Sequence, residues 1–120
     1  MNEMEKVLRD LNEKSASKGS VVVTNDGMVV AADMRKEIRK DIVGALSSFL
    51  ISATDRCLRQ GEIGHFGRMI MTATHGKVII QSLHEFFLVV VVDQFTDMEV
   101  ALEAVTKAGA KLRELTNIRI

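Results

Sequence analysis

Few side chains in this sequence have reactive or metal-binding chemistry. There is one cysteine, Cys57, and three histidines, His65, His75 and His84. The histidine spacing does not match the i, i+4 pair by which a helix presents two metal ligands. Cys57 falls on an apolar helical stripe, where a thiol acts as a small hydrophobe rather than as a nucleophile. We therefore expect loop histidines, a buried cysteine, no catalytic residue and no metal site.

Two glycine patterns resemble phosphate-binding loops. Gly61, Gly64 and Gly67 are evenly spaced, but they precede an apolar strand-like run. A nucleotide-binding glycine loop instead follows a strand and opens onto a helix. Gly76-Lys77 is only a fragment of the P-loop pattern and falls between two apolar runs. We interpret both patterns as turns and expect no bound nucleotide and no other cofactor.

Composition and charge exclude several classes of protein. The 120 residues are 47% hydrophobic and suit one domain spanning residues 1–120. Sixteen basic and sixteen acidic residues balance, so the strong positive field typical of nucleic-acid binding is absent. The longest apolar run, residues 86–92, is far shorter than the ~20 residues of a membrane helix. We expect a cytoplasmic protein with no nucleic-acid partner and no direct membrane insertion.

Hydrophobic periodicity predicts the elements that position these residues. Helices are expected over residues 2–16, 35–60 and 97–116, and strands over residues 21–24, 28–31, 66–73, 77–83 and 86–92. Asp33 and Asp97 are the expected caps of the second and third helices, and Gly61 is expected to end the second. Asn25-Asp26-Gly27 predicts a tight hairpin turn, because Gly supplies the positive φ. The order indicates an α+β fold with an antiparallel sheet.

The long helix is more apolar than one buried face requires. One stripe at helical spacing contains Ile38, Ile42, Leu46, Phe49, Ala53 and Cys57, and further apolar residues lie off it. A second copy of the helix is one candidate for covering the excess surface. Met69 and Met71 lie on a possible edge strand, where a protein partner could pair.

The densest charge cluster is basic. Arg35, Lys36, Arg39 and Lys40 fall at the expected start of the long helix, with Glu37 between them. Three readings stay open: an ordinary solvated face, a contact patch for an acidic protein surface, and, as a weaker option, a lipid contact.

The segment Gly19-Ser-Val-Val-Val-Thr-Asn-Asp-Gly-Met-Val-Val-Ala31 resembles the first hairpin of the Roadblock / dynein light-chain family. The later runs Gly76-Lys-Val-Ile-Ile80 and Phe87-Leu-Val-Val-Val91 are similar to that family's later strands. The resemblance extends over the whole chain. It implies a helix-β-β-helix-β-β-β-helix domain with a five-stranded antiparallel sheet of order 2-1-5-4-3. The long helix would cover one face and the terminal helices the other.

The resemblance also implies a function and a homodimer. Family members are typically scaffolds or regulators of small Ras-like GTPases, and a bacterial gliding-motility member accelerates its partner's GTP hydrolysis. The chain is therefore expected to be a non-catalytic regulator, at most GTPase-activating, with no cofactor. The expected GTPase-binding residues are Lys36, Arg39, Lys40, Ser47 and Arg56. The expected dimer contacts are Val43, Ser47, Leu50, Ile51, Met69 and Met71.

Two other classes of function remain. One is a structural adaptor, like a motor light chain, that binds a peptide or scaffold irrespective of nucleotide. The other is a small-ligand sensor, which the absence of Trp and Tyr from the sequence makes less favourable.

Overall fold

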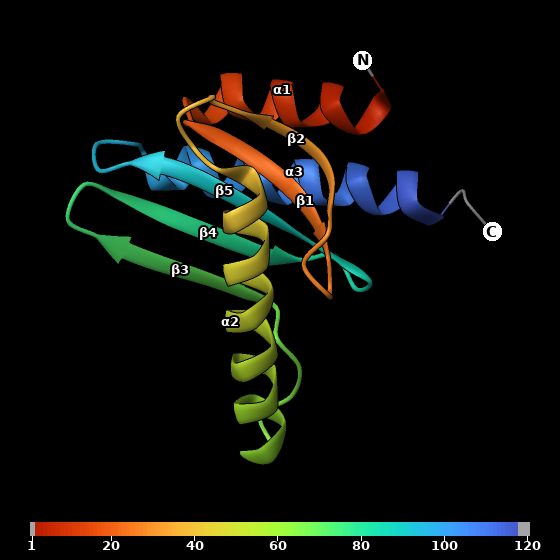
Figure 1. Cartoon of the computed structure of the whole chain (residues 1–120). Helices are drawn as coiled ribbons and strands as arrows, with labels where there is room; N and C mark the ends of the chain where they lie inside the picture. Colours follow the sequence, from red (N-terminus) through yellow and green to blue (C-terminus); the bar gives the residue numbers. More distant parts are fainter. Residues whose placement is uncertain (1, 118–120) are drawn as a thin grey trace.

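The computed structural model describes residues 2–117 and has three helices and five strands (Figure 1). The elements are α1 (Glu3–Ser15), β1 (Gly19–Thr24), β2 (Val29–Met34), α2 (Lys40–Gln60), β3 (Arg68–Ala73), β4 (Gly76–Ser82), β5 (Phe86–Asp93) and α3 (Met98–Asn117). This is the predicted order of elements, and most bounds differ from the prediction by one to three residues.

All five strands form one antiparallel sheet in the order β2-β1-β5-β4-β3. The sheet order implied by the family resemblance is therefore confirmed. The pairing of β1 with β5 joins the first hairpin to the β3-β4-β5 meander, with Val21 opposite Val89. The outermost strands are β2 and β3.

Each face of the sheet has its own hydrophobic core. On one face, α1 and α3 pack over side chains that include Val22, Leu88 and Val90. On the other, α2 packs over side chains that include Val21 and Val89. Consecutive valines of β1 thus face opposite cores, which is why this strand is an unbroken apolar run rather than an alternating one. Residues 20–23 are all fully buried.

Local signals explain where several elements begin and turn. A capping box starts α1, in which the Asn2 side chain accepts from the Glu5 N–H and the Glu5 carboxylate accepts from the Asn2 N–H. Gly27 has φ +96° in the predicted hairpin turn. Asp97 Oδ1 accepts hydrogen bonds from the N–H groups of Glu99 and Val100, so it caps α3 as expected.

The predicted start of the long helix is wrong. α2 begins at Lys40 rather than at residue 35, and Asp33 does not cap it. Asp33 lies in β2, where its carboxylate accepts a hydrogen bond of 2.9 Å from Asn12 Nδ2. The strand continues to Met34 because Met34 pairs with Gly19, so residues 35–38 form a turn before the helix can start. The helix was predicted to begin too early because residues 35–39 continue the helical spacing of the residues that follow.

α2 is not fully supported by the sheet. Figure 1 shows it crossing the strands, with its second half extending past the edge strand β3. Val43 and Ile51 pack against the core over the sheet, and further along the helix Leu58 packs against the same core. Much of α2 and the outer edge of β3 remain open on the same side of the molecule.

Candidate protein-interaction site

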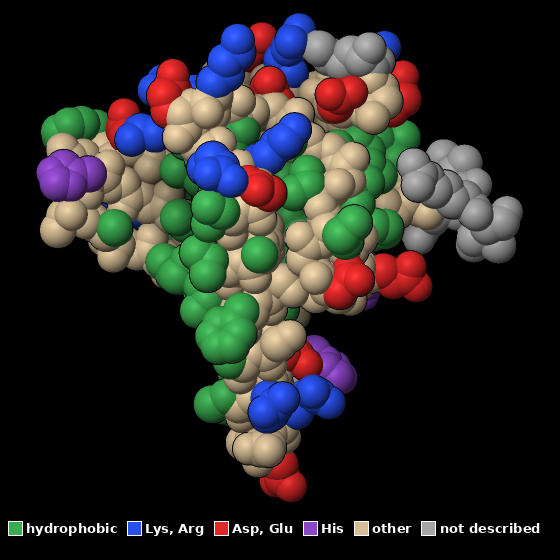
Figure 2. Space-filling model, in the orientation of Figure 1, with side chains coloured by type: hydrophobic (Ala, Val, Ile, Leu, Met, Phe, Trp, Pro, Cys, Tyr) green, Lys and Arg blue, Asp and Glu red, His purple; other side chains and the backbone are tan. Residues whose placement is uncertain are grey.

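An exposed apolar row follows the outer face of α2. Ile42 is 45% exposed, Leu46 60% and Phe49 72%. Ala53 and Cys57 continue the row at the same helical spacing and are also exposed. Figure 2 shows hydrophobic side chains along the front of this helix. A contiguous apolar surface of this kind on a small domain is typical of a protein-protein contact.

The opposite face of α2 packs on the chain's own sheet. Ser47 is only 5% exposed, and Val43 and Ile51 contact the core beneath the helix. Gly44 allows the close approach, since a Cβ on it would lie 3.3 Å from the carbonyl oxygen of Gly27 in the hairpin turn. Gly44 therefore lets α2 pack closely on the chain's own first hairpin.

This packing changes the predicted dimer contacts. Val43, Ser47 and Ile51 face inward, and Leu50 is half-buried beside them. Ser47, which was predicted to contact both a GTPase and a second copy of the chain, is 5% exposed in the single chain. The predicted buried cysteine is also wrong, because Cys57 is exposed. A helix with two apolar faces gives no periodic signal for which of them covers its own sheet.

β3 is an edge strand, as expected, and its outer side pairs with no strand among the described residues. Met69 and Met71 are half-buried on the α2 side of the sheet. Ile70 points to the other side and is 42% exposed. Because an open strand edge can pair with another chain, β3 continues the candidate surface beside α2.

The predicted basic residues lie at two separate places. Lys36 and Arg39 precede α2, Lys40 is its first residue, and all three are exposed. The Arg39 guanidinium donates a 3.3 Å hydrogen bond to Asp41 and so lowers the pKa of that carboxyl. Arg56 is exposed sixteen residues further along the helix, about 24 Å away at 1.5 Å per residue. A single chain therefore does not bring Arg56 to the other three.

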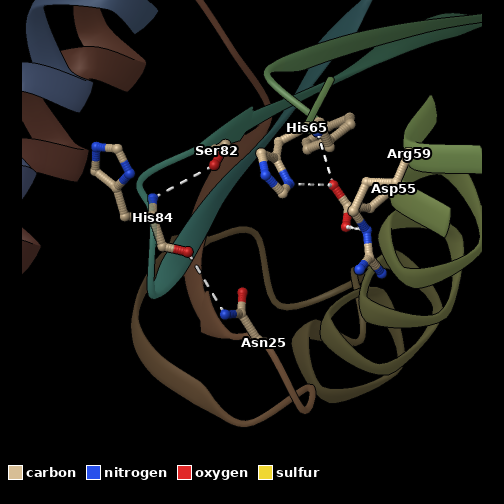
Figure 3. A network of polar contacts seen from close by, with 7 residues as sticks. Asn25, Asp55, Arg59, His65, Ser82 and His84 are labelled. Atoms are coloured by element: carbon tan, nitrogen blue, oxygen red, sulfur yellow. Dashed lines mark hydrogen bonds and ion pairs between the residues drawn. The ribbon is translucent and has the colours of Figure 1, made fainter. Parts of the chain in front are cut away.

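A polar network that the sequence reading missed ties the protruding end of α2 to the following loop (Figure 3). Asp55 Oδ1 accepts a 2.8 Å hydrogen bond from the Phe66 N–H, and Asp55 Oδ2 lies 2.9 Å from Arg59 Nε. The Phe66 hydrogen bond, with the Arg59 charge acting in the same direction, lowers the pKa of the Asp55 carboxyl. His65 Nδ1 lies 3.7 Å from the same carboxylate.

A polar hollow of about 720 Å³ separates this network from the β4-β5 turn. On its far side, Asn25 donates to the carbonyl of His84, and the His84 N–H donates to Ser82 Oγ. His75 lies apart, in the β3-β4 turn. Over residues 2–117, no three histidine, cysteine or carboxylate side chains are placed to hold a metal ion. The polar groups around the hollow connect neighbouring segments: Asp55 binds the loop before β3, and Asn25 binds the β4-β5 turn.

The fold and the open surface together define a class of protein: an α+β domain with one long helix alone on one face of a 2-1-5-4-3 sheet. Residues 3–93 match the family model of the Roadblock/LC7 domain, so the chain belongs to the Roadblock/LC7 family. Of the described helices, none is long and apolar enough to cross a membrane.

Several known proteins are similar. Two Methanocaldococcus jannaschii proteins, MJ1340 and MJ0310, both called uncharacterized, are each 27% identical over 93% of this chain and 98% of their own length. Among solved structures, Myxococcus xanthus MglB superposes with a TM-score of 0.93 at 14% identity, covering 98% of this chain and 97% of that one. A Roadblock/LC7 domain from Streptomyces avermitilis gives 0.88 at 16% identity, covering 96% and 98%.

Proposed function

We propose that the chain forms a homodimer through the exposed row of α2 and the open edge of β3. The observation that carries this proposal is the row itself, in which Leu46 and Phe49 are more than half exposed on a helix that extends past its own sheet. A two-fold axis near Phe49 would cover both rows at once, because each helix would then lie antiparallel to its copy. Pairing of the two β3 edges would join the two sheets.

We further propose that this dimer is a non-catalytic regulator or scaffold that binds a small Ras-like GTPase and modulates its GTP hydrolysis or localisation. The chain's membership of the Roadblock/LC7 family supports it. The family resemblance in the sequence implies that members regulate or anchor such GTPases. The proposed dimer also supports it electrostatically. In an antiparallel helix pair, Arg56 lies beside the basic start of the partner helix. Lys36, Arg39 and Lys40 then join Arg56 in one surface that a single chain cannot form.

The test is nucleotide-dependent capture. The tagged protein is incubated with lysate of the source organism loaded with either GDP or a non-hydrolysable GTP analogue, and the bound proteins are identified by mass spectrometry. We expect a GTPase enriched with the analogue. Equal capture in both states, with no GTPase bound, would instead favour the nucleotide-independent adaptor.

The binding surface is then tested on the captured GTPase. The double variant Arg39→Glu/Lys40→Glu should weaken binding roughly ten-fold or more at low salt, because two favourable charge contacts become repulsive. Arg9→Glu/Lys107→Glu makes the same change of charge on the other helices and should leave affinity unchanged. Equal affinities for the two variants would remove the basic residues from the site.

A further inference from the structure

A hollow of about 930 Å³ lies beside the start of α2, on the face of the sheet that α2 covers. Val43 of α2 and Ile38 of the preceding turn line one side of it. Val78 of β4 and Val91 of β5, which pair with each other across the sheet, line the other. All four side chains are only half-buried, so the single chain leaves part of this apolar surface uncovered.

The charged residues around this hollow are mostly basic. Lys18, Arg35 and Lys36 line it, against one carboxylate, that of Glu37. Over residues 2–117, none of these four side chains takes part in an ion pair. A group that fits the hollow would therefore combine an apolar side chain with a neighbouring carboxylate.

The other end of α2 carries such a combination. Glu62 and Ile63 follow the helix almost directly; Glu62 is exposed, and Ile63 is 77% exposed. Hydrogen bonds to the last turn of the helix fix both residues. The Glu62 N–H donates to the Arg59 carbonyl at 3.1 Å, and the Ile63 N–H donates to the Leu58 carbonyl at 2.9 Å. Because this tip is already ordered in the single chain, little conformational entropy would be lost when it binds.

The antiparallel helix pair proposed above brings the tip of one chain to the hollow of the other. With a two-fold axis near Phe49, the helix start at Lys40 and the helix end at Gln60 both lie about 15 Å from the axis, at 1.5 Å per residue. The end of one helix is then level with the start of its partner. Glu62 and Ile63, just beyond that end, lie beside residues 36–38 of the other chain.

The hollow also opens on the correct flank of α2. Val43, which lines it, is next to Ile42, the first residue of the exposed row. The opposite flank is covered by the first hairpin, since Gly27 lies against Gly44 and Ser48. A partner helix that covers the exposed row therefore approaches from the side on which the hollow lies.

We propose that, in the homodimer, the Glu62-Ile63 tip of each chain inserts into the hollow of its partner. Ile63 would cover Val78 and Val91, and Glu62 would lie beside the basic residues around the hollow. This inference rests on the proposed dimer and adds two identical contacts at the ends of its helix pair. It gives the protruding end of α2 (Figure 1) a role, which is to carry the tip over the partner's sheet.

The apolar part of the contact is tested by the dissociation constant of the full-length dimer, measured by sedimentation equilibrium. Ile63→Asp should weaken the dimer roughly ten-fold or more, because a carboxylate would replace the apolar side chain in the hollow. Phe95→Asp makes the same kind of change at a residue that is 84% exposed in the β5-α3 loop, and it should leave the constant unchanged. Circular dichroism should show native folding for both variants, since both side chains are exposed.

The charged part is tested by exchanging the two signs. Glu62→Lys and Arg35→Glu should each weaken the dimer about five-fold at low salt, and their combination should recover most of the loss. Arg35 is chosen because it is not among the proposed GTPase contacts. Glu62→Lys combined with Lys111→Glu, a charge reversal on α3, is the control and should recover nothing.

The outcomes separate this inference from the dimer on which it rests. If the original chain is monomeric at all concentrations, the dimer and the tip contact both fail. If Phe49→Asp gives monomers but Ile63→Asp dimerises with an unchanged constant, the dimer stands and the tip assignment is overturned. The tip assignment is also overturned if the charge exchange recovers no more affinity than its control.

Discussion

The side chain of Asp55 holds the backbone of Phe66 across eleven residues, with 2.8 Å between the Asp55 Oδ1 and Phe66 N atoms. This contact closes the loop between α2 and β3 and fixes where the edge strand begins. Phe66 itself is 9% exposed and belongs to the core under α2. The protruding end of α2 and the start of β3 are thus positioned by one carboxylate.

Replacing this carboxylate should loosen the loop without unfolding the domain. We expect Asp55→Ala to speed amide hydrogen exchange over residues 62–67, because the Phe66 N–H loses its acceptor and the loop its anchor. Exchange in β1 and β5 should not change. Protection of residues 62–67 equal to that of the original protein would show that packing of Phe66 alone fixes the loop.

The contribution of Asp55 to stability should depend on pH. Its pKa is lowered in the folded chain, so its stabilising effect is complete above the ordinary aspartate pKa of about 3.9 and is lost as pH falls through the lower folded-state pKa. The difference in urea midpoint between the original protein and Asp55→Asn should therefore be constant from pH 7 to about pH 5 and shrink below pH 4. A difference that persists unchanged to pH 2.5 would contradict this assignment.

The two faces of α2 should respond differently to the same substitution. Phe49→Asp should give a folded monomer, because Phe49 is exposed in the single chain and would be covered only in the proposed dimer. Ile51→Asp should destabilise the single chain by about 2 kcal/mol, because Ile51 packs on the chain's own sheet. Light scattering and urea unfolding separate the two effects. Phe95→Asp, at an exposed position outside the interface, is the control and should remain dimeric; a Phe49→Asp dimer of unchanged affinity would refute the interface.

The proposed antiparallel arrangement can be tested by cross-linking. A two-fold axis near Phe49 places position 42 of one helix opposite Cys57 of the other. Ile42→Cys should therefore give covalent dimers with a short bis-maleimide reagent. Ile42→Cys combined with Cys57→Ser should give far fewer, since position 42 would lie far from its own copy. Equal yields from both variants would contradict the antiparallel pair.

Close packing of α2 on the first hairpin predicts a steric effect at Gly44. A Cβ there would lie 3.3 Å from both the Gly27 carbonyl oxygen and the Val29 Cγ2 atom. Gly44→Val should lower the free energy of unfolding by roughly 1–3 kcal/mol. Gly67→Val is the matched control, because nothing lies within 4 Å of an added Cβ at that position. Equal urea midpoints for the two variants would show that α2 can shift away from the turn.

The sequence was sufficient for the elements, because turns such as Asp26-Gly27 and caps such as Asp97 are local signals, whereas the sheet order came from the resemblance to the Roadblock / dynein light-chain family. It was not sufficient for the orientation of α2, whose two apolar faces have the same helical period. The hydrogen bond between Asp55 and Phe66 could not be predicted from the sequence either, because it depends on the path of the loop from α2 to β3. The interaction surface could therefore be assigned to a helix from the sequence, but not to a face of that helix.

The apolar runs of the central strands β1 and β5 affect how these two strands align with each other. Val21 pairs with Val89, but Val22 pairs with Leu88 and Val23 with Phe87. A pairing displaced by one residue would therefore exchange the side chains that enter the two cores. Two glycines at strand ends restrict the alignment of neighbouring strands further. A Cβ on Gly19 would lie 2.7 Å from Met34, and one on Gly76 would lie 2.6 Å from the Val92 carbonyl oxygen. A larger residue at position 19 would thus force β1 away from β2, and one at position 76 would force β4 away from β5.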